Sequence, residues 1–443
     1  MKLLASSSSS SSSTMMPVTQ RLLVVHVALL LSGLSSVSAE LRRNGEICVS
    51  PTNTYTAKVD IHASERGYYV FEECGEDWVN PTIGLEFGQV YTFIQKHKSN
   101  YWHPIDFSYF PDAHHVGAEL LDPRTKGNDG GDSIISNLPN QQTTTTSAAS
   151  ANGPADTCAT NMTCPAPMYF LNDGYLGTYS NIKEVAPITS NEHDIGLELY
   201  EDFFFKSMAT WTGFGTFSIQ LKFDDESYTG KDIFYYCRIH QFMAGRMKLL
   251  KNGVPVNEQD DPPMYFEMET PGQFDAMCGT YGLDAFQLPH PQCPDRFVCD
   301  VDERMRDFAS CIDAMDCHMI LGMTTKVSSK TELALFVHQM IPHHQNAVNM
   351  AKALLKAGFL PCDDLTNEED PYCIMQSLLY GIVNRQNHEI GVMSKILAGL
   401  NLPPTDDCEV LVGDEGLHGS SRGLKGMAVT AAGAMFGAAA HAF

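Results

Sequence analysis

Positive charge is scarce in this chain of 443 residues, which carries 29 Lys and Arg side chains against 53 Asp and Glu. The formal net charge of −24 argues against nucleic acid as a partner, and against docking on an anionic membrane through charge. An acidic surface suits metal cations or a basic partner, although most acidic proteins are simply soluble. At this length the chain can form two domains with cores of ordinary size.

Long apolar runs are also lacking. The run from Leu22 to Leu31 is too short to span a membrane. It is followed by Val37-Ser38-Ala39, a small-residue cleavage site, so residues 1–39 with their serine-rich start are expected to be a signal peptide. We therefore expect a protein of the secretory pathway, either secreted or at the cell surface.

The C-terminal tail, residues 404–443, ends in an apolar stretch rich in Ala and Gly. Small residues, a short polar spacer and an apolar terminus are the layout of a GPI-attachment signal, and a frayed helix is the alternative. In both cases we expect no transmembrane span in the mature chain.

The 13 cysteines fit an oxidising compartment, because setting Cys237 aside leaves an even twelve, compatible with six bridges. The sequon Asn161-Met162-Thr163 predicts a glycoprotein if the chain is secreted. Plausible local disulfides join Cys48 with Cys74, Cys158 with Cys164, and Cys362 with Cys373.

A Cys-x-x-His-x-x-Met run, formed by Cys237, His240 and Met243, ends an aromatic segment of β-type composition. Thiolate, imidazole and thioether are the ligands of a blue-copper site, which needs two histidines and one cysteine in a plane and a weak axial methionine. His103, before a proline, is the candidate for the second histidine, and Met247 is the alternative axial ligand. Such residues also pack together without binding a metal.

The stretch from about Glu46 to Leu250 resembles a cupredoxin, and its ligand spacing is similar to that of amicyanin. The run from Pro81 to Phe93 resembles the strand pair before the first copper histidine of such domains. The resemblance implies a Greek-key β-sandwich over residues 40–255, with one type 1 copper. Its implied ligands are His103, Cys237, His240 and Met243.

Two further segments interrupt or follow this domain. Residues 116–157 are polar and rich in Gly, Asn, Thr and Ser, which predicts a surface insertion without a core of its own. Residues 256–294 form a linker that contains proline and cysteine.

From residue 295 to 403 apolar residues recur every three or four positions, which predicts an antiparallel helical bundle. Within it, the run from Met340 to Ala351, Met-Ile-Pro-His-His-Gln-Asn-Ala-Val-Asn-Met-Ala, is similar to the signature of the ferritin-like DUF305 family. This resemblance implies a ferritin-like fold and a suspected metal-binding role. We therefore expect a multidomain β + α protein.

A second copper site inside the bundle is the hypothesis that follows if three helix faces converge. Helical geometry places the adjacent His343 and His344 on one side of their helix, while His388 of a later helix points away from the corresponding face. A methionine-rich core without metal is the alternative. The candidate ligands are Met315, His318, Met340, His343, His344, Met350, Glu389 and Met393.

His-x-His pairs, which a trinuclear copper cluster requires, are lacking in the sequence. The position after the thiolate is Arg238, where multicopper oxidases have a histidine, and we expect it to be an exposed charge at a strand end. The paired Glu-x-x-His motifs of a di-iron bundle are lacking too. These absences argue against a multicopper oxidase and against ferroxidase chemistry, and no catalytic residue is predicted.

The sequence therefore predicts a secreted or cell-surface copper-binding protein that serves copper handling, one-electron transfer or both. An exposed edge of His240 would connect the copper to an unknown redox or copper-transfer partner protein. The alternative is a structural or adhesive extracellular protein whose helical bundle binds no metal.

Overall fold

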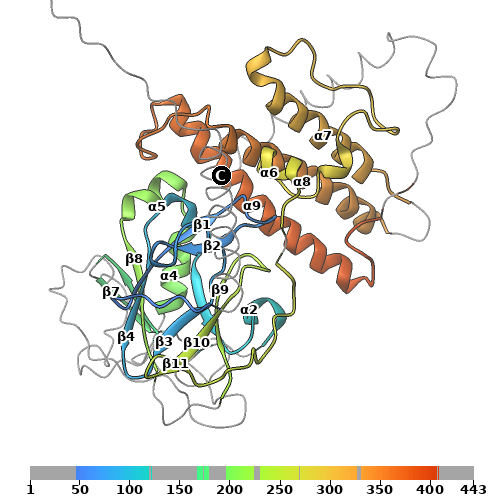
Figure 1. Ribbon diagram of the computed structural model, residues 1–443. Coiled ribbons are helices and arrows are strands. Elements are labelled where there is room, and N and C mark those ends of the chain that lie inside the picture. Colours follow the sequence, from blue (N-terminus) through green and yellow to red (C-terminus); the bar gives the residue numbers. More distant parts are fainter. Residues whose placement is uncertain are drawn as a thin grey trace, which may run out of the picture.

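The structure is a computed structural model that describes residues 46–118, 121, 167–172, 174–178, 196–223, 230–268, 270–326, 331–406 and 408 (Figure 1). Several predictions fall outside these residues. They are the signal peptide, nearly all of the insertion at 116–157, the sequon at Asn161, the pair Cys158 and Cys164, and the tail beyond residue 408.

Two sheets form the first part of the chain. The larger sheet has six strands in the order β2 (Tyr68–Phe71), β1 (Thr54–Asp60), β4 (Val90–Gln95), β8 (Phe217–Lys222), β6 (Met168–Leu171), β7 (Gly174–Thr178). The smaller has five, in the order β11 (Val254–Pro255), β10 (Gly245–Lys251), β9 (Ile233–Cys237), β5 (Ile105–Ser108), with β3 (Ile83–Glu86) parallel to β10. In β4 and β8, which pair antiparallel, buried and half-buried residues alternate, as expected for strands with one face on a core.

Aromatic side chains fill the space between the two sheets. The ring of Phe71 from β2 lies 5.2 Å from that of Tyr235 in β9, and Phe93 of β4 lies 5.1 Å from Phe107 of β5. Edge-on packing of this kind adds about 0.5–1.5 kcal/mol per pair to the burial of the rings. The two sheets therefore share one core, and we call this part the β-domain.

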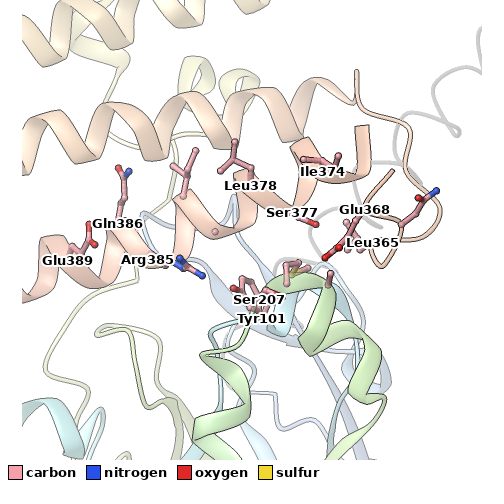
Figure 2. A pocket seen from close by; sticks show the side chains of 15 residues that line it. Tyr101, Ser207, Leu365, Glu368, Ile374, Ser377, Leu378, Arg385, Gln386 and Glu389 are labelled. Carbon is pink, nitrogen blue, oxygen red and sulfur yellow. The ribbon is translucent and has the colours of Figure 1, made fainter. Parts of the chain in front are cut away.

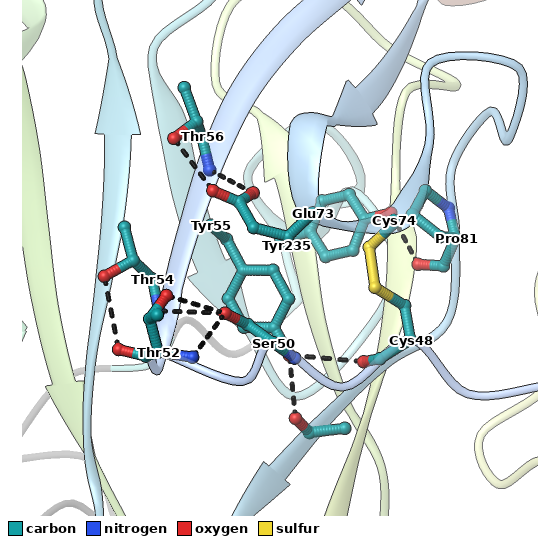
Figure 3. Close-up of a disulfide and its surroundings, with 11 residues drawn as sticks. Cys48, Ser50, Thr52, Thr54, Tyr55, Thr56, Glu73, Cys74, Pro81 and Tyr235 are labelled. Atoms are coloured by element: carbon teal, nitrogen blue, oxygen red, sulfur yellow. Dashed lines mark hydrogen bonds between the residues drawn. A yellow bond between two sulfur atoms is a disulfide. The ribbon is translucent and has the colours of Figure 1, made fainter.

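The predicted disulfide between Cys48 and Cys74 is confirmed, and it closes one edge of this core (Figure 3). Beside it the buried Tyr55 hydroxyl donates to the carbonyl oxygen of Gly84 at 2.9 Å and receives the amide N–H of Ser50 at 3.1 Å. These bonds fasten the segment before β1 to β3.

Three long helices form the second part of the described chain, which we call the helical domain: α7 (Arg306–Gly322), α8 (Glu332–Ala357) and α9 (Pro371–Gly399). The side chain of Thr331 caps the start of α8, and Gly358, with φ of 68°, ends it. Asp370 caps α9, whose first residue is proline. The shorter helices are η1 (Glu72–Cys74), η2 (Lys98–Asn100), α2 (Ala113–Val116), α4 (Gly196–Phe204), α5 (Met208–Phe214), α6 (Gln273–Cys278), η4 (Asp284–Phe286) and η5 (Glu303–Met305).

Disulfides hold the segment between the two parts against the helices. Cys278–Cys311 and Cys293–Cys317 join it to α7, and the predicted Cys362–Cys373 closes the connection from α8 to α9. The six bridges with which the number of cysteines is compatible do not all form, because Cys299 and Cys408 carry no disulfide.

Helix α9 lies between the β-domain and the other long helices (Figure 1). Its buried residues recur at helical spacing, and Tyr380 packs into the aromatic core of the β-domain. None of the described helices combines the length and apolarity that crossing a bilayer needs. The predicted order, a β-rich part followed by a helical part, is confirmed.

Candidate metal centre

Three potential ligands meet at one end of the β-domain. The Sγ atom of Cys237 lies 3.7 Å from Nδ1 of His103 and 3.5 Å from Nδ1 of His240. All three side chains are buried, with 0%, 0% and 2% of their surface exposed for His103, Cys237 and His240. The three predicted in-plane ligands therefore lie together, although 134 positions separate the cysteine from the first histidine.

Strand pairing brings them together. Ile105 of β5 is the register partner of Cys237 at the end of β9, so the residues just before β5 lie beside the cysteine. Trp102, next to His103, has a φ of 65°, a left-handed conformation that is unusual for a bulky residue. Strain of this kind is typical of functional sites.

The spacing of the donor atoms fits one metal ion of the first transition row. Bonds of about 2.3 Å to sulfur and 2.0–2.1 Å to nitrogen put the two donors roughly 3.6 Å apart at a tetrahedral angle and 3.8 Å apart at a trigonal angle. The observed separations of 3.5 and 3.7 Å match this range. Only the methionine remains to be placed.

The far nitrogen of each imidazole is held by one residue of α9. Nε2 of His103 lies 3.0 Å from the side-chain oxygen Oδ1 of Asn384, and Nε2 of His240 lies 2.8 Å from its backbone oxygen. Asn384 also donates from Nδ2 to the carbonyl oxygen of Tyr101 at 2.7 Å, which orients the amide with its oxygen toward His103. Both Nε2 atoms must therefore carry the proton, and both Nδ1 lone pairs face the cysteine.

Burial keeps these groups uncharged in the absence of a metal. Desolvation lowers the pKa of His103 to about 3 and lowers the pKa of His240 well below its usual range. Desolvation also raises the pKa of the Cys237 thiol to about 12. The neutral imidazoles are ready to bind, whereas the thiol loses its proton only to a metal that compensates the buried charge.

Strand register separates the two axial candidates. Met247 is the register partner of Ile233, four residues before Cys237 on β9. At about 3.3 Å per residue this places it roughly 13 Å along the sheet from the cysteine. Met243 is fully buried in the loop that carries His240, so it is the better axial candidate.

The loop after Cys237 is supported by two residues that the sequence did not single out. The buried carboxylate of Asp112 accepts the backbone N–H of Phe242, and desolvation raises its pKa to about 6. Nε2 of His115 lies 3.0 Å from the carbonyl oxygen of Cys237, to which it donates. Neither residue lies near the motif in sequence, so no spacing rule could have found it.

Two expectations about the surroundings of the centre are wrong. Arg238 is not an exposed charge, because its side chain is 13% exposed and pairs with Asp106 at 3.1 Å and Glu201 at 2.7 Å. His240 has no exposed edge, because α9 covers it. The two errors have different origins, since Arg238 is held by Asp106 of β5 and Glu201 of α4, whereas His240 is covered by α9 of the helical domain.

The structure brings together only part of the predicted second site in the helices. His343 is exposed, and Glu389, which reaches His344 at 3.1 Å, has 53% of its side chain exposed. Met315 packs in one apolar cluster with Cys278 and Cys311, while Met393 packs against a different one. Among the described residues, His318, His343, His344 and Glu389 form no group of three with donor atoms close enough to share an ion, and Met340 and Met350 add no buried anchor.

His290, Cys293 and Cys317 also lie close together, but both sulfurs are in a disulfide and are not available as ligands.

Two hollows lie beside the centre, both under α9. A groove of about 570 Å³ runs between α9 and α5, with Leu378 and Arg385 on one wall and Ser207 on the other (Figure 2). A smaller hollow of about 140 Å³ adjoins His240 and His388. His388, predicted to point away from the face of its helix that carries Glu389 and Met393, lies against the β-domain, 3.5 Å from the carbonyl oxygen of Ile239.

Comparison of the chain with family models, with curated proteins and with solved structures gave no match.

Proposed function

We propose that this protein binds one copper ion at His103, Cys237, His240 and Met243, in a cupredoxin-like β-domain, and serves copper handling, one-electron transfer or both. The observation that carries the proposal is the meeting of one thiol and two Nδ1 lone pairs at 3.5 and 3.7 Å in a buried pocket. The two sheets with a common core, and ligands from the β5 and β9 ends, are the framework that such a domain requires.

The donor set favours copper over other metals. Two imidazoles and one thiolate with a thioether nearby are the ligands of blue-copper sites, and Zn²⁺ is the main competitor. Bound copper would take up and release one electron. Within the group of donors that the structure places together there is no carboxylate, which calcium, magnesium or manganese would prefer.

The enclosure of the centre favours binding and electron transfer over catalysis on a substrate. His103, Cys237 and His240 are buried, and their second nitrogens or backbone atoms are held by Asn384 and His115. Ligands held in this way keep their positions when the charge of the metal changes, and their burial restricts the access of a substrate to the metal.

The helical domain belongs to the proposal as a DUF305-like, ferritin-related module, because the run that resembles that family lies on α8. The helical domain contributes to the proposed site by lying against it, where Asn384 of α9 contacts His103 and His240. The four disulfides among the described residues favour a secreted or cell-surface location.

Reconstitution with copper tests the proposal. The purified chain should bind about one copper and show an intense blue absorption band from the thiolate. Cys237→Ser should abolish the band while the far-UV circular dichroism stays unchanged. Cys299→Ser is the matched control, because it removes an exposed unpaired thiol outside the centre. A colourless wild type that cannot be reconstituted, or a band that survives in Cys237→Ser, would refute the proposal.

A further inference from the structure

Asn384 is the one place where the helical domain touches both histidines of the centre within the described chain. Its side chain and backbone occupy the Nε2 atoms of His103 and His240 at 3.0 and 2.8 Å. The residue is 1% exposed, so water does not compete for these bonds. Without α9 both Nε2–H groups would lose their acceptor.

The contact around Asn384 is polar and specific. Lys352 of α8, 1% exposed, donates to the carbonyl oxygens of Ser64 and Glu65 at 2.7 and 2.6 Å. Asn387, one turn after Asn384, donates to the oxygen of Glu65 at 3.2 Å. A buried ammonium is tolerated only where its hydrogen bonds are made, so the two domains fit in one arrangement.

We propose that the helical domain completes the metal centre, with Asn384 as the positioning residue. Its side-chain oxygen fixes the tautomer of His103, and its backbone oxygen accepts the Nε2–H of His240. The inference rests on the proposed copper site. An imidazole whose Nε2–H has an acceptor presents an unprotonated Nδ1 to the metal and cannot rotate away. The helical domain therefore acts on the copper through hydrogen bonds to its ligands.

Replacement of the side chain separates the two histidines. Asn384→Ala removes the Oδ1 acceptor of His103 but leaves the backbone oxygen that serves His240. Loss of such a hydrogen-bond partner typically lowers metal affinity about 10- to 100-fold.

Asn346→Ala is the matched control. Asn346 is a buried asparagine of α8 whose side chain faces the sulfurs of Met319 and Met350, away from the β-domain. The Asn346→Ala substitution removes the same atoms from a helix of the same domain. It should leave the copper affinity within about threefold of the wild type, because no metal ligand loses a hydrogen-bond partner.

The first measurement is a competition titration of the full chain with Cu(I) against a chelator of known affinity. The second uses the metal-free protein: nitrogen chemical shifts of the imidazoles should show His103 losing its fixed Nε2–H tautomer in Asn384→Ala, while His240 keeps it.

Selective loss of the tautomer at His103 together with weakened copper binding supports the inference. Equal copper affinities in wild type and Asn384→Ala, or an unchanged His103 tautomer in Asn384→Ala, would overturn it. A wild type that binds no copper would instead refute the metal site itself, and the imidazole signals would still report on Asn384.

Discussion

Arg238→Met should destabilise the β-domain by about 3–5 kcal/mol, because it removes one partner of a buried ion pair. Asp106, whose side chain is 1% exposed, would then keep the hydroxyl of Tyr236 at 2.6 Å and the amide of Phe107 at 2.8 Å as donors, but no cation. The bond of Arg238 to Glu201 adds at most about 1 kcal/mol, since Glu201 is partly exposed to solvent.

Urea unfolding of the metal-free chain at pH 7, followed by circular dichroism, measures this loss. Glu201→Gln is the control and should cost about 1 kcal/mol or less. The double variant Asp106→Asn with Arg238→Met should recover part of the loss, because no buried charge is left without a partner. A cost below about 1 kcal/mol for Arg238→Met, equal to that of the control, would show that Asp106 does not depend on Arg238.

Three further outcomes are expected. Met243→Leu should shift the reduction potential of the copper-loaded protein strongly and Met247→Leu should shift it little, as voltammetry would show. A strong shift with Met247→Leu alone would identify Met247 as the axial ligand instead. Burial lowers the pKa of His62 to about 4, so the unfolded chain takes up a proton at a higher pH than the folded chain does. The free energy of unfolding should therefore decrease as the pH is lowered from 6.5 to 4, by up to about 1.4 kcal/mol per pH unit. A His62→Gln variant should flatten this slope in urea titrations, and an unchanged slope would assign the effect elsewhere. Gly245→Ala, at the start of β10, should lower the melting temperature of the protein, because the added carbon would lie 2.0 Å from the ring and hydroxyl of Tyr235. An unchanged melting temperature would show that the ring can move aside.

The meeting of His103, Cys237 and His240 could be predicted because a strand end, a short loop and a chemical requirement restrict the choice. Cys237 and His240 lie three positions apart, and the search for one more histidine led to His103. Asn384 could not be found in this way, since it lies 281 positions from His103 and asparagine carries no ligand chemistry of its own.

The faces of α8 were predicted less well than its existence. Helical periodicity placed His343 and His344 inward, but the buried positions include Asn346, Asn349 and Lys352. Each of these polar side chains has a hydrogen-bond partner. Lys352 donates to the carbonyl oxygens of Ser64 and Glu65 in the β-domain, whereas Asn349 accepts from Gln345 of α8 itself. A pattern that counts only apolar residues cannot detect a polar interface between domains.

The disulfides bear on how the chain matures. Within the described residues each bridge joins cysteines 11 to 33 positions apart, and none links the β-domain to the helical domain. Each part can therefore complete its own oxidation during synthesis, and an error in assembling the two parts can be corrected without thiol exchange. The buried Cys237 is then the thiol that must be kept out of this oxidation until the centre closes over it.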